Sequence, residues 1–79
     1  MDTEHLVQMA NRIAEFFDAM PDHGEAVEGV AQHIRRFWEP RMRAALLQHA
    51  RQTREAGLHP LVAEALRTHE ALLAPAARA

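Results

Sequence analysis

The chain has 79 residues, of which 48% are hydrophobic, a formal net charge of −2 and no cysteine. A domain of this size buries only about 60% of its unfolded surface, so we expect modest stability and consider a partner or self-association a reasonable source of further stabilisation. The lack of cysteine excludes disulfides and thiolate metal sites, and the nearly balanced charge disfavours a general nucleic-acid binder.

The spacing of apolar residues predicts a first helix over about residues 3–19. Apolar side chains recur at intervals of three and four on one stripe, which comprises Leu6, Ala10, Ile13, Phe17 and Met20. Met9 and Phe16 widen this stripe, so we expect the helix to pack against more than one neighbour. Pro21 is expected to end it.

A second helix is predicted to begin after Asp22, a favourable N-cap residue, with Glu25 in the capping-box position. Its expected inner stripe consists of His23, Val27, Val30, Ile34 and Phe37. Gly29 lies within this helix and weakens it by up to ~1 kcal/mol relative to alanine. Such a glycine is useful where a neighbouring backbone must approach closely.

Glu39 and Pro40 predict a break, because the residue before proline avoids the α region and proline favours the first helical position. A third helix is expected from Pro40 to Gly57, with Gly57 at C′ and Leu58 folding back on the last turn. A fourth helix is expected from about residues 59–60 to 73, and its inner stripe consists of Val62, Leu66, His69 and Leu73. Residues 74–79 are expected to form a frayed tail.

Four short helices joined by tight turns predict an all-α fold, which is a small bundle or an orthogonal array. No strand-like alternation is present, and residues 1–73 are expected to form a single domain. Charged residues interrupt the first twenty positions, and no uncharged run approaches the ~20 residues that a membrane span needs. We therefore expect a cytoplasmic protein without a membrane segment.

The residue types needed for a catalytic or metal site are sparse. The six histidines include no pair spaced three or four apart, so the helical arrangement that places two imidazoles on one metal is missing. Histidines 49 and 69 are expected to be hydrogen-bonded residues of the core. Serine, tyrosine and a glycine-rich phosphate loop are also lacking, so we predict no catalytic, cofactor-binding or metal site in this chain.

Charge is distributed unevenly along the sequence. Residues 1–30 contain seven acidic residues and one arginine, whereas residues 31–56 contain six arginines and two glutamates. Arginine is enriched at protein interfaces, and the segment "IRRFWEPRMR" combines it with the only tryptophan. The predicted partner-binding residues are Arg35, Arg36, Trp38, Arg41, Arg43, Leu47, Arg51 and Arg54. A solvated basic helix face remains the alternative for the last four of these residues.

Three segments resemble the delta subunit of the cytoplasmic NAD-dependent formate dehydrogenases that contain molybdenum or tungsten. They are "HLVQMANRIAEFF", "AVEGVAQHIRRFWEPRMR" and "GLHPLVAEAL", which follow the family's order and cover most of residues 4–66. The middle segment is the most specific of the three, because helix-forming composition alone would not generate it.

The resemblance implies an accessory subunit without a redox centre, supporting assembly, stability or activity of a larger enzyme. It implies larger formate dehydrogenase subunits that carry the molybdenum or tungsten cofactor, iron–sulfur clusters, FMN and the NAD site. Two alternatives remain open at this point. One is a homodimeric assembly factor that binds the same enzyme transiently, and the other, less favoured, is a small nucleic-acid-binding helical protein.

Overall fold

The computed structural model describes residues 2–75 and confirms the all-α prediction. These residues form five helices and no strand: α1 (Thr3–Phe17), α2 (His23–Phe37), α3 (Pro40–Thr53), α4 (Pro60–Thr68) and α5 (Glu70–Leu73). Part of the predicted tail, residues 76–79, lies outside the described residues. Among the described helices, none is long and apolar enough to cross a membrane.

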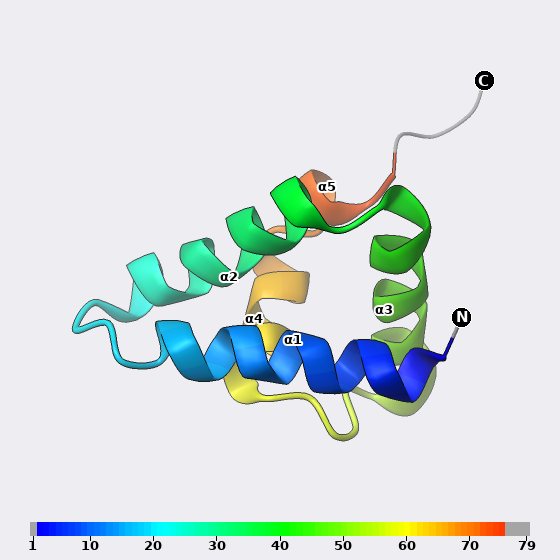
Figure 1. Ribbon diagram of the computed structural model, residues 1–79, viewed down its shortest axis with the longest axis horizontal. Coiled ribbons are helices and arrows are strands. Elements are labelled where there is room, and N and C mark those ends of the chain that lie inside the picture. Colours follow the sequence, from blue (N-terminus) through cyan, green and yellow to red (C-terminus); the bar gives the residue numbers. More distant parts are fainter. Residues whose placement is uncertain (1, 76–79) are drawn as a thin grey trace.

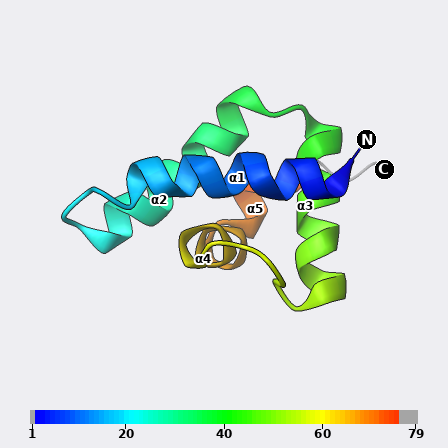
Figure 2. The same ribbon diagram turned by 60° about the horizontal axis from the view of Figure 1, so that its bottom comes forward.

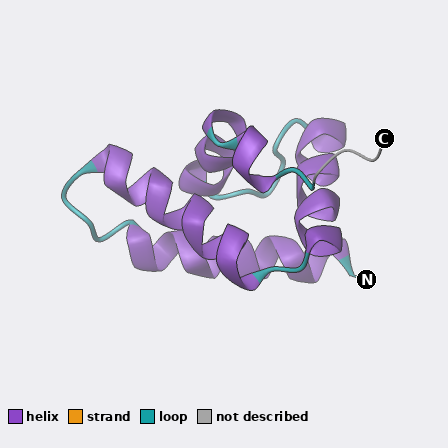
Figure 3. Cartoon of the chain, turned by 90° about the horizontal axis from the view of Figure 1, so that it is seen from above, coloured by secondary structure: helices purple, strands orange, loops and turns teal. Residues whose placement is uncertain are grey.

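The helices form an orthogonal array rather than a parallel bundle. In Figure 1, α1 and α2 run antiparallel as a hairpin, and α3 lies across the end of this hairpin near the beginning of the chain. Turning the molecule in Figure 2 brings α4 forward beside α1, and α4 packs most extensively on α2. Figure 3 shows from above that the helices are joined by short loops. The core therefore lies between the α1–α2 hairpin on one side and helices α3, α4 and α5 on the other.

Local sequence signals account for where most helices begin. The Asp22 carboxylate accepts a hydrogen bond of 2.8 Å from the backbone N–H of Glu25, as the predicted N-cap requires. Proline occupies the start of both α3 and α4. At α4 the His59 ring also acts as a cap, because its Nδ1 accepts a hydrogen bond of 3.0 Å from the backbone N–H of Leu61.

The prediction that Phe37 lies on the inner face of α2 is wrong. Its side chain is 70% exposed, whereas that of Trp38 is only 5% exposed. The reason is that α2 ends at Phe37, and Trp38 continues in an extended conformation with φ −96° and ψ 140°. The helical period therefore no longer applies at Trp38, whose indole enters the core. His23, also assigned to the inner stripe, is exposed at the first turn of α2.

The third helix ends earlier than predicted, at Thr53 rather than next to Gly57. Arg54 and Glu55 both have left-handed backbone, with φ of 54° and 66°. The Thr53 hydroxyl stabilises this turn by donating to the His49 carbonyl at 2.7 Å and accepting from the Ala56 N–H at 3.2 Å. Side chains such as threonine compete with helical hydrogen bonding near helix ends, and this competition explains the early stop.

The predicted fourth helix is interrupted at His69, whose φ of −119° and ψ of 29° are not helical. The chain resumes as the short helix α5, which places Leu73 in the core with no exposed surface. His69 itself is half-buried rather than part of a continuous inner stripe. The break therefore turns the last helical residues across the end of α2, with which α5 is in contact.

Gly29 allows the side chain of Phe17 to lie against α2. A Cβ atom placed on Gly29 would lie 2.5 Å from two ring carbons of Phe17. Gly29 therefore makes room for an aromatic side chain, whereas the sequence suggested the close approach of a neighbouring backbone. We expect Gly29→Ala to lower the free energy of unfolding by about 1–3 kcal/mol in urea denaturation, because the ring must move out of its packed position.

Gly24→Ala provides a matched control in the same helix. A Cβ atom at Gly24 meets only Asp22 Oδ2, at an ordinary contact distance of 3.4 Å. This variant should be neutral or more stable by about 0.4–1 kcal/mol, because alanine reduces the entropy of the unfolded chain. Equal effects of the two substitutions would contradict a specific contact between Gly29 and Phe17.

Candidate partner-binding surface

The eight residues predicted to bind a partner separate into two groups in the structure. Trp38, Arg43 and Leu47 are buried, with exposed fractions of 5%, 6% and 5%. The other five are exposed, namely Arg35, Arg36, Arg41, Arg51 and Arg54. The buried group therefore offers little side-chain surface to another molecule, whereas the exposed group is available for contact.

Arg43 connects the corner between α2 and α3 to the end of α5. Its Nη1 donates to the Trp38 carbonyl at 2.9 Å, and its Nε donates to the Leu73 carbonyl at 2.8 Å. These carbonyls belong to the C-cap residue of α2 and the last residue of α5, where helix ends carry partial negative charge. No carboxylate within residues 2–75 forms an ion pair with this guanidinium. The buried cation is thus stabilised by backbone carbonyls.

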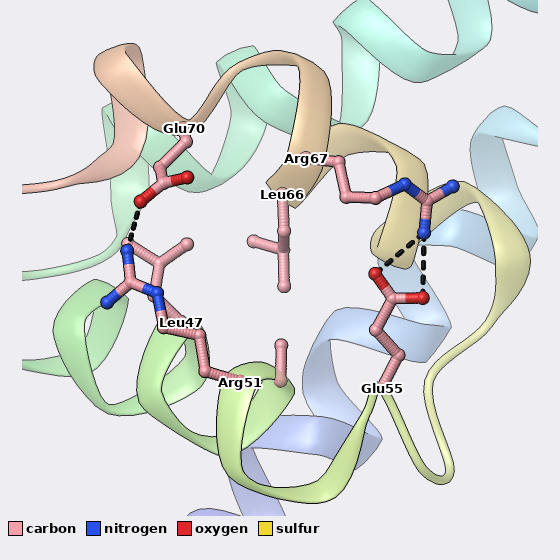
Figure 4. A pocket seen from close by; sticks show the side chains of 7 residues that line it. Leu47, Arg51, Glu55, Leu66, Arg67 and Glu70 are labelled. Carbon is pink, nitrogen blue, oxygen red and sulfur yellow. Dashed lines mark hydrogen bonds and ion pairs between the residues drawn. The ribbon is translucent and has the colours of Figure 1, made fainter.

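A small pocket of about 150 Å³ lies between α3 and the α4–α5 segment. Figure 4 shows Leu47 and Leu66 between two ion pairs. Arg51 pairs with Glu70, and Arg67 pairs with Glu55 at 2.6 Å. Because each guanidinium is matched by a carboxylate, the pocket has no excess charge with which to select a charged ligand. The two ion pairs link α3, and the residues that directly follow it, to α4 and α5.

Four of the exposed predicted arginines have no ion-pair partner among residues 2–75, and they are Arg35, Arg36, Arg41 and Arg54. The first three flank the α2–α3 corner, which is fixed internally by Trp38 and Arg43. Glu39, four residues after Arg35, forms no ion pair with it. The corner therefore presents more exposed positive than negative charge, beside the internal hydrogen bonds of Arg43.

Three of the six histidine rings form hydrogen bonds within residues 2–75, namely those of His23, His49 and His59. His23 Nε2 lies 2.7 Å from Glu64 Oε1, which joins α2 to α4. His49 Nε2 lies 3.2 Å from the Ala56 carbonyl, so the expected hydrogen bond is present, but the residue is half-buried and not part of the core. Within the part of the chain that the structure describes, no group of three or more His, Cys, Asp or Glu side chains is arranged to hold a metal ion.

Asn11 has a role that the sequence analysis missed. Its amide Nδ2 donates to the Gly57 carbonyl at 2.9 Å, and its Oδ1 accepts from the His59 N–H at 2.8 Å. These two bonds join α1 to the loop before α4, 46 and 48 residues further along the chain. A polar residue beside the apolar stripe of α1 was the available signal, but the sequence does not reveal its distant partners.

Two exposed aromatic residues were also missed as candidate binding residues. Phe16 is 75% exposed and Phe37 is 70% exposed, although both had been assigned to inner helix faces. The signal for Phe16 was its position at the edge of the α1 stripe. As expected, α1 packs against more than one neighbour, since it contacts α2, α3 and α4. None of these helices covers the Phe16 ring, which is left accessible.

Comparison with known proteins identifies the family. A search of curated proteins gave no match, and no solved structure matched the chain. Residues 5–66 match the family model described as NADH-dependant formate dehydrogenase delta subunit FdsD. This range contains most of α1, all of α2 and α3, and most of α4, and it includes the α2–α3 corner. The chain therefore belongs to the delta subunit family of NADH-dependent formate dehydrogenase.

Proposed function

We propose that the chain is a non-catalytic accessory subunit that binds the larger subunits of an NAD-dependent formate dehydrogenase and supports assembly, stability or activity of the complex. The family match over residues 5–66 is the observation that carries this proposal. The absence of cysteine, serine and tyrosine from the sequence also favours a role through protein contact. The molybdenum or tungsten cofactor, iron–sulfur clusters, FMN and NAD site would then belong to the partners, in the cytoplasm.

The proposed contact surface includes the α2–α3 corner. Arg35, Arg36 and Arg41 are exposed there without an intramolecular ion pair within residues 2–75, and Arg54 extends the set beyond α3. In this proposal Trp38 and Arg43 contribute by holding the corner, Leu47 packs in the core, and Arg51 pairs with Glu70. Arginines at the rim of an interface speed association and confer salt dependence.

Co-purification tests this function. The chain is expressed together with the larger formate dehydrogenase subunits, one of which carries the affinity tag, and its ratio to them is measured. We expect a constant stoichiometric ratio through successive purification steps. A substoichiometric ratio that falls at each step would instead support a transient assembly factor, and complete loss of the chain would contradict the proposed subunit.

The double variant Arg35→Ala/Arg36→Ala tests the corner. We expect faster loss of this variant from the complex, with the difference from wild type shrinking as salt is raised, because salt screens exposed charges. Arg67→Ala is the matched control, since Arg67 pairs with Glu55 inside the chain. Equal retention of the double variant and wild type at every salt concentration would remove these two arginines from the proposed surface.

A further inference from the structure

A continuous row of aromatic rings lies across α1 and α2. The rings of Phe16 and Phe17 pack edge to face with centroids 5.1 Å apart. Phe17 is followed by His33 at 6.3 Å, and His33 by Phe37 at 4.8 Å. The two ends of this row, Phe16 and Phe37, are the exposed large hydrophobic residues of the described chain.

A pocket of about 360 Å³ opens beside this row. It is lined by Arg12, Ile13, Phe16, Phe17 and His33, and most of its exposed lining is apolar. The pocket is thus suited to an apolar side chain, which would remove the rings of the row from water. We use the name aromatic surface for these five residues together with Phe37.

Packing within the chain explains only the middle of the aromatic surface. Phe17 rests against Gly29, and Ile13 packs against the core. Phe16 and Phe37 are left at the two ends, where each exposes most of its side chain. Aromatic residues gain most from burial when a partner covers them, and they are enriched at protein interfaces.

Charge indicates the chemistry of the occupant. Arg12 is the one residue lining the pocket with a permanent charge, and it forms no ion pair within residues 2–75. A complementary surface would therefore offer apolar side chains to the pocket and a carboxylate to the guanidinium, an arrangement that favours charge-assisted hydrogen bonds.

We propose that the aromatic surface is where an apolar projection of a larger formate dehydrogenase subunit, bordered by a carboxylate, binds this chain. This inference rests on the proposed function and adds the docking face and the chemistry of the partner. The partner side chain enters the pocket beside Phe16, and its carboxylate pairs with Arg12. Phe37 extends the contact toward the arginines of the α2–α3 corner.

A second copy of the chain fits this surface less well. In an isologous dimer, the same patch of both subunits forms the interface. Two copies joined through the pocket would bring two Arg12 side chains into one contact, and the pocket itself contributes no carboxylate to pair with them. A partner with an acidic border avoids this repulsion.

The experiment uses the co-expressed complex with the tag on a larger subunit. The double variant Phe16→Ala/Phe37→Ala should be retained at least about tenfold less well than wild type, as expected for loss of a central aromatic contact. Arg12→Glu should also weaken retention, because it places a carboxylate opposite the partner's carboxylate. Circular dichroism of each isolated variant should match wild type, since all three side chains are exposed.

The double variant Glu28→Ala/Gln32→Ala is the matched control, because both residues are exposed on α2 and neither lines the pocket. It should be retained like wild type. Retention of Phe16→Ala/Phe37→Ala at the wild-type level, with loss of Arg35→Ala/Arg36→Ala, would overturn the aromatic surface and leave the proposed function intact. Failure of the wild-type chain to bind the larger subunits would refute both.

Sedimentation of the isolated chain tests whether a second copy of the chain, rather than a larger subunit, covers the aromatic surface. We expect the same sedimentation coefficient for wild type and Phe16→Ala/Phe37→Ala. A wild-type dimer that becomes monomeric in this variant, while retention on the larger subunits stays unchanged, would assign the surface to a second copy and overturn the proposal.

Discussion

Trp38→Ala is expected to lower the free energy of unfolding by about 3–5 kcal/mol in urea denaturation, the usual cost of truncating a buried tryptophan. The side chain is 95% removed from solvent by contacts in the core at the end of α2. Small domains have a total stability of only about 5–15 kcal/mol, so this loss would remove a large share of it. Loss of the variant from the enzyme complex would then reflect unfolding of the chain.

Phe37→Ala is the matched control for Trp38→Ala. The two aromatic residues are adjacent in sequence, but the side chain of Phe37 is 70% exposed. Its truncation should change the free energy of unfolding by no more than about 0.5 kcal/mol. A larger loss of stability in Phe37→Ala than in Trp38→Ala would mean that the inner face of the corner had been assigned to the wrong ring.

Arg43→Met is expected to lower the free energy of unfolding by about 2–4 kcal/mol. Methionine has a long side chain that fills similar space but donates no hydrogen bond, so the carbonyls of Trp38 and Leu73 lose a charged donor inside the protein. Chemical denaturation at neutral pH measures the effect. Amide hydrogen exchange in α5 should also become faster, because α5 is held partly by this bond.

Two further variants identify the source of that stability. Arg43→Lys keeps the charge but replaces the planar guanidinium with a single ammonium group, so it should recover only part of the loss. Arg41→Met removes an exposed arginine of the same helix and should change stability by less than about 0.5 kcal/mol. If all three variants unfolded at the same urea concentration, the two carbonyl contacts of Arg43 would not stabilise the fold.

Local signals in the sequence were sufficient to predict the helices but less reliable at their ends. The Asp22 cap and the proline at the start of α3 act through neighbouring residues, so the sequence identifies them directly. The end of α3 depends on the Thr53 hydroxyl and on two left-handed residues, for which Gly57 was a misleading signal. Trp38 was predicted to bind a partner, whereas the structure buries it in the core, because the helical period of α2 ends at Phe37.

The candidate surface was predictable only in its charge. The exposed arginines follow from their number and from the outer face of α2, whereas burial of Arg43 depends on Leu73, 30 residues further along the chain. The spacing of residues along one helix contains no information about such a long-range contact. Phe16 and Phe37 were missed for the opposite reason, because hydrophobicity predicts burial and their exposure appears only when the neighbouring helices are placed.

The bond from Arg43 to Leu73 also bears on how the chain is made. Synthesis proceeds from the N-terminus, and the domain is a unit that folds cooperatively. The α2–α3 corner lies in the middle of the sequence, yet one of the two carbonyls that hold its buried cation belongs to residue 73. A nascent chain therefore cannot complete this corner until α5 has left the ribosome, so the partner contact that we propose for the corner would have to form after α5 has been synthesised.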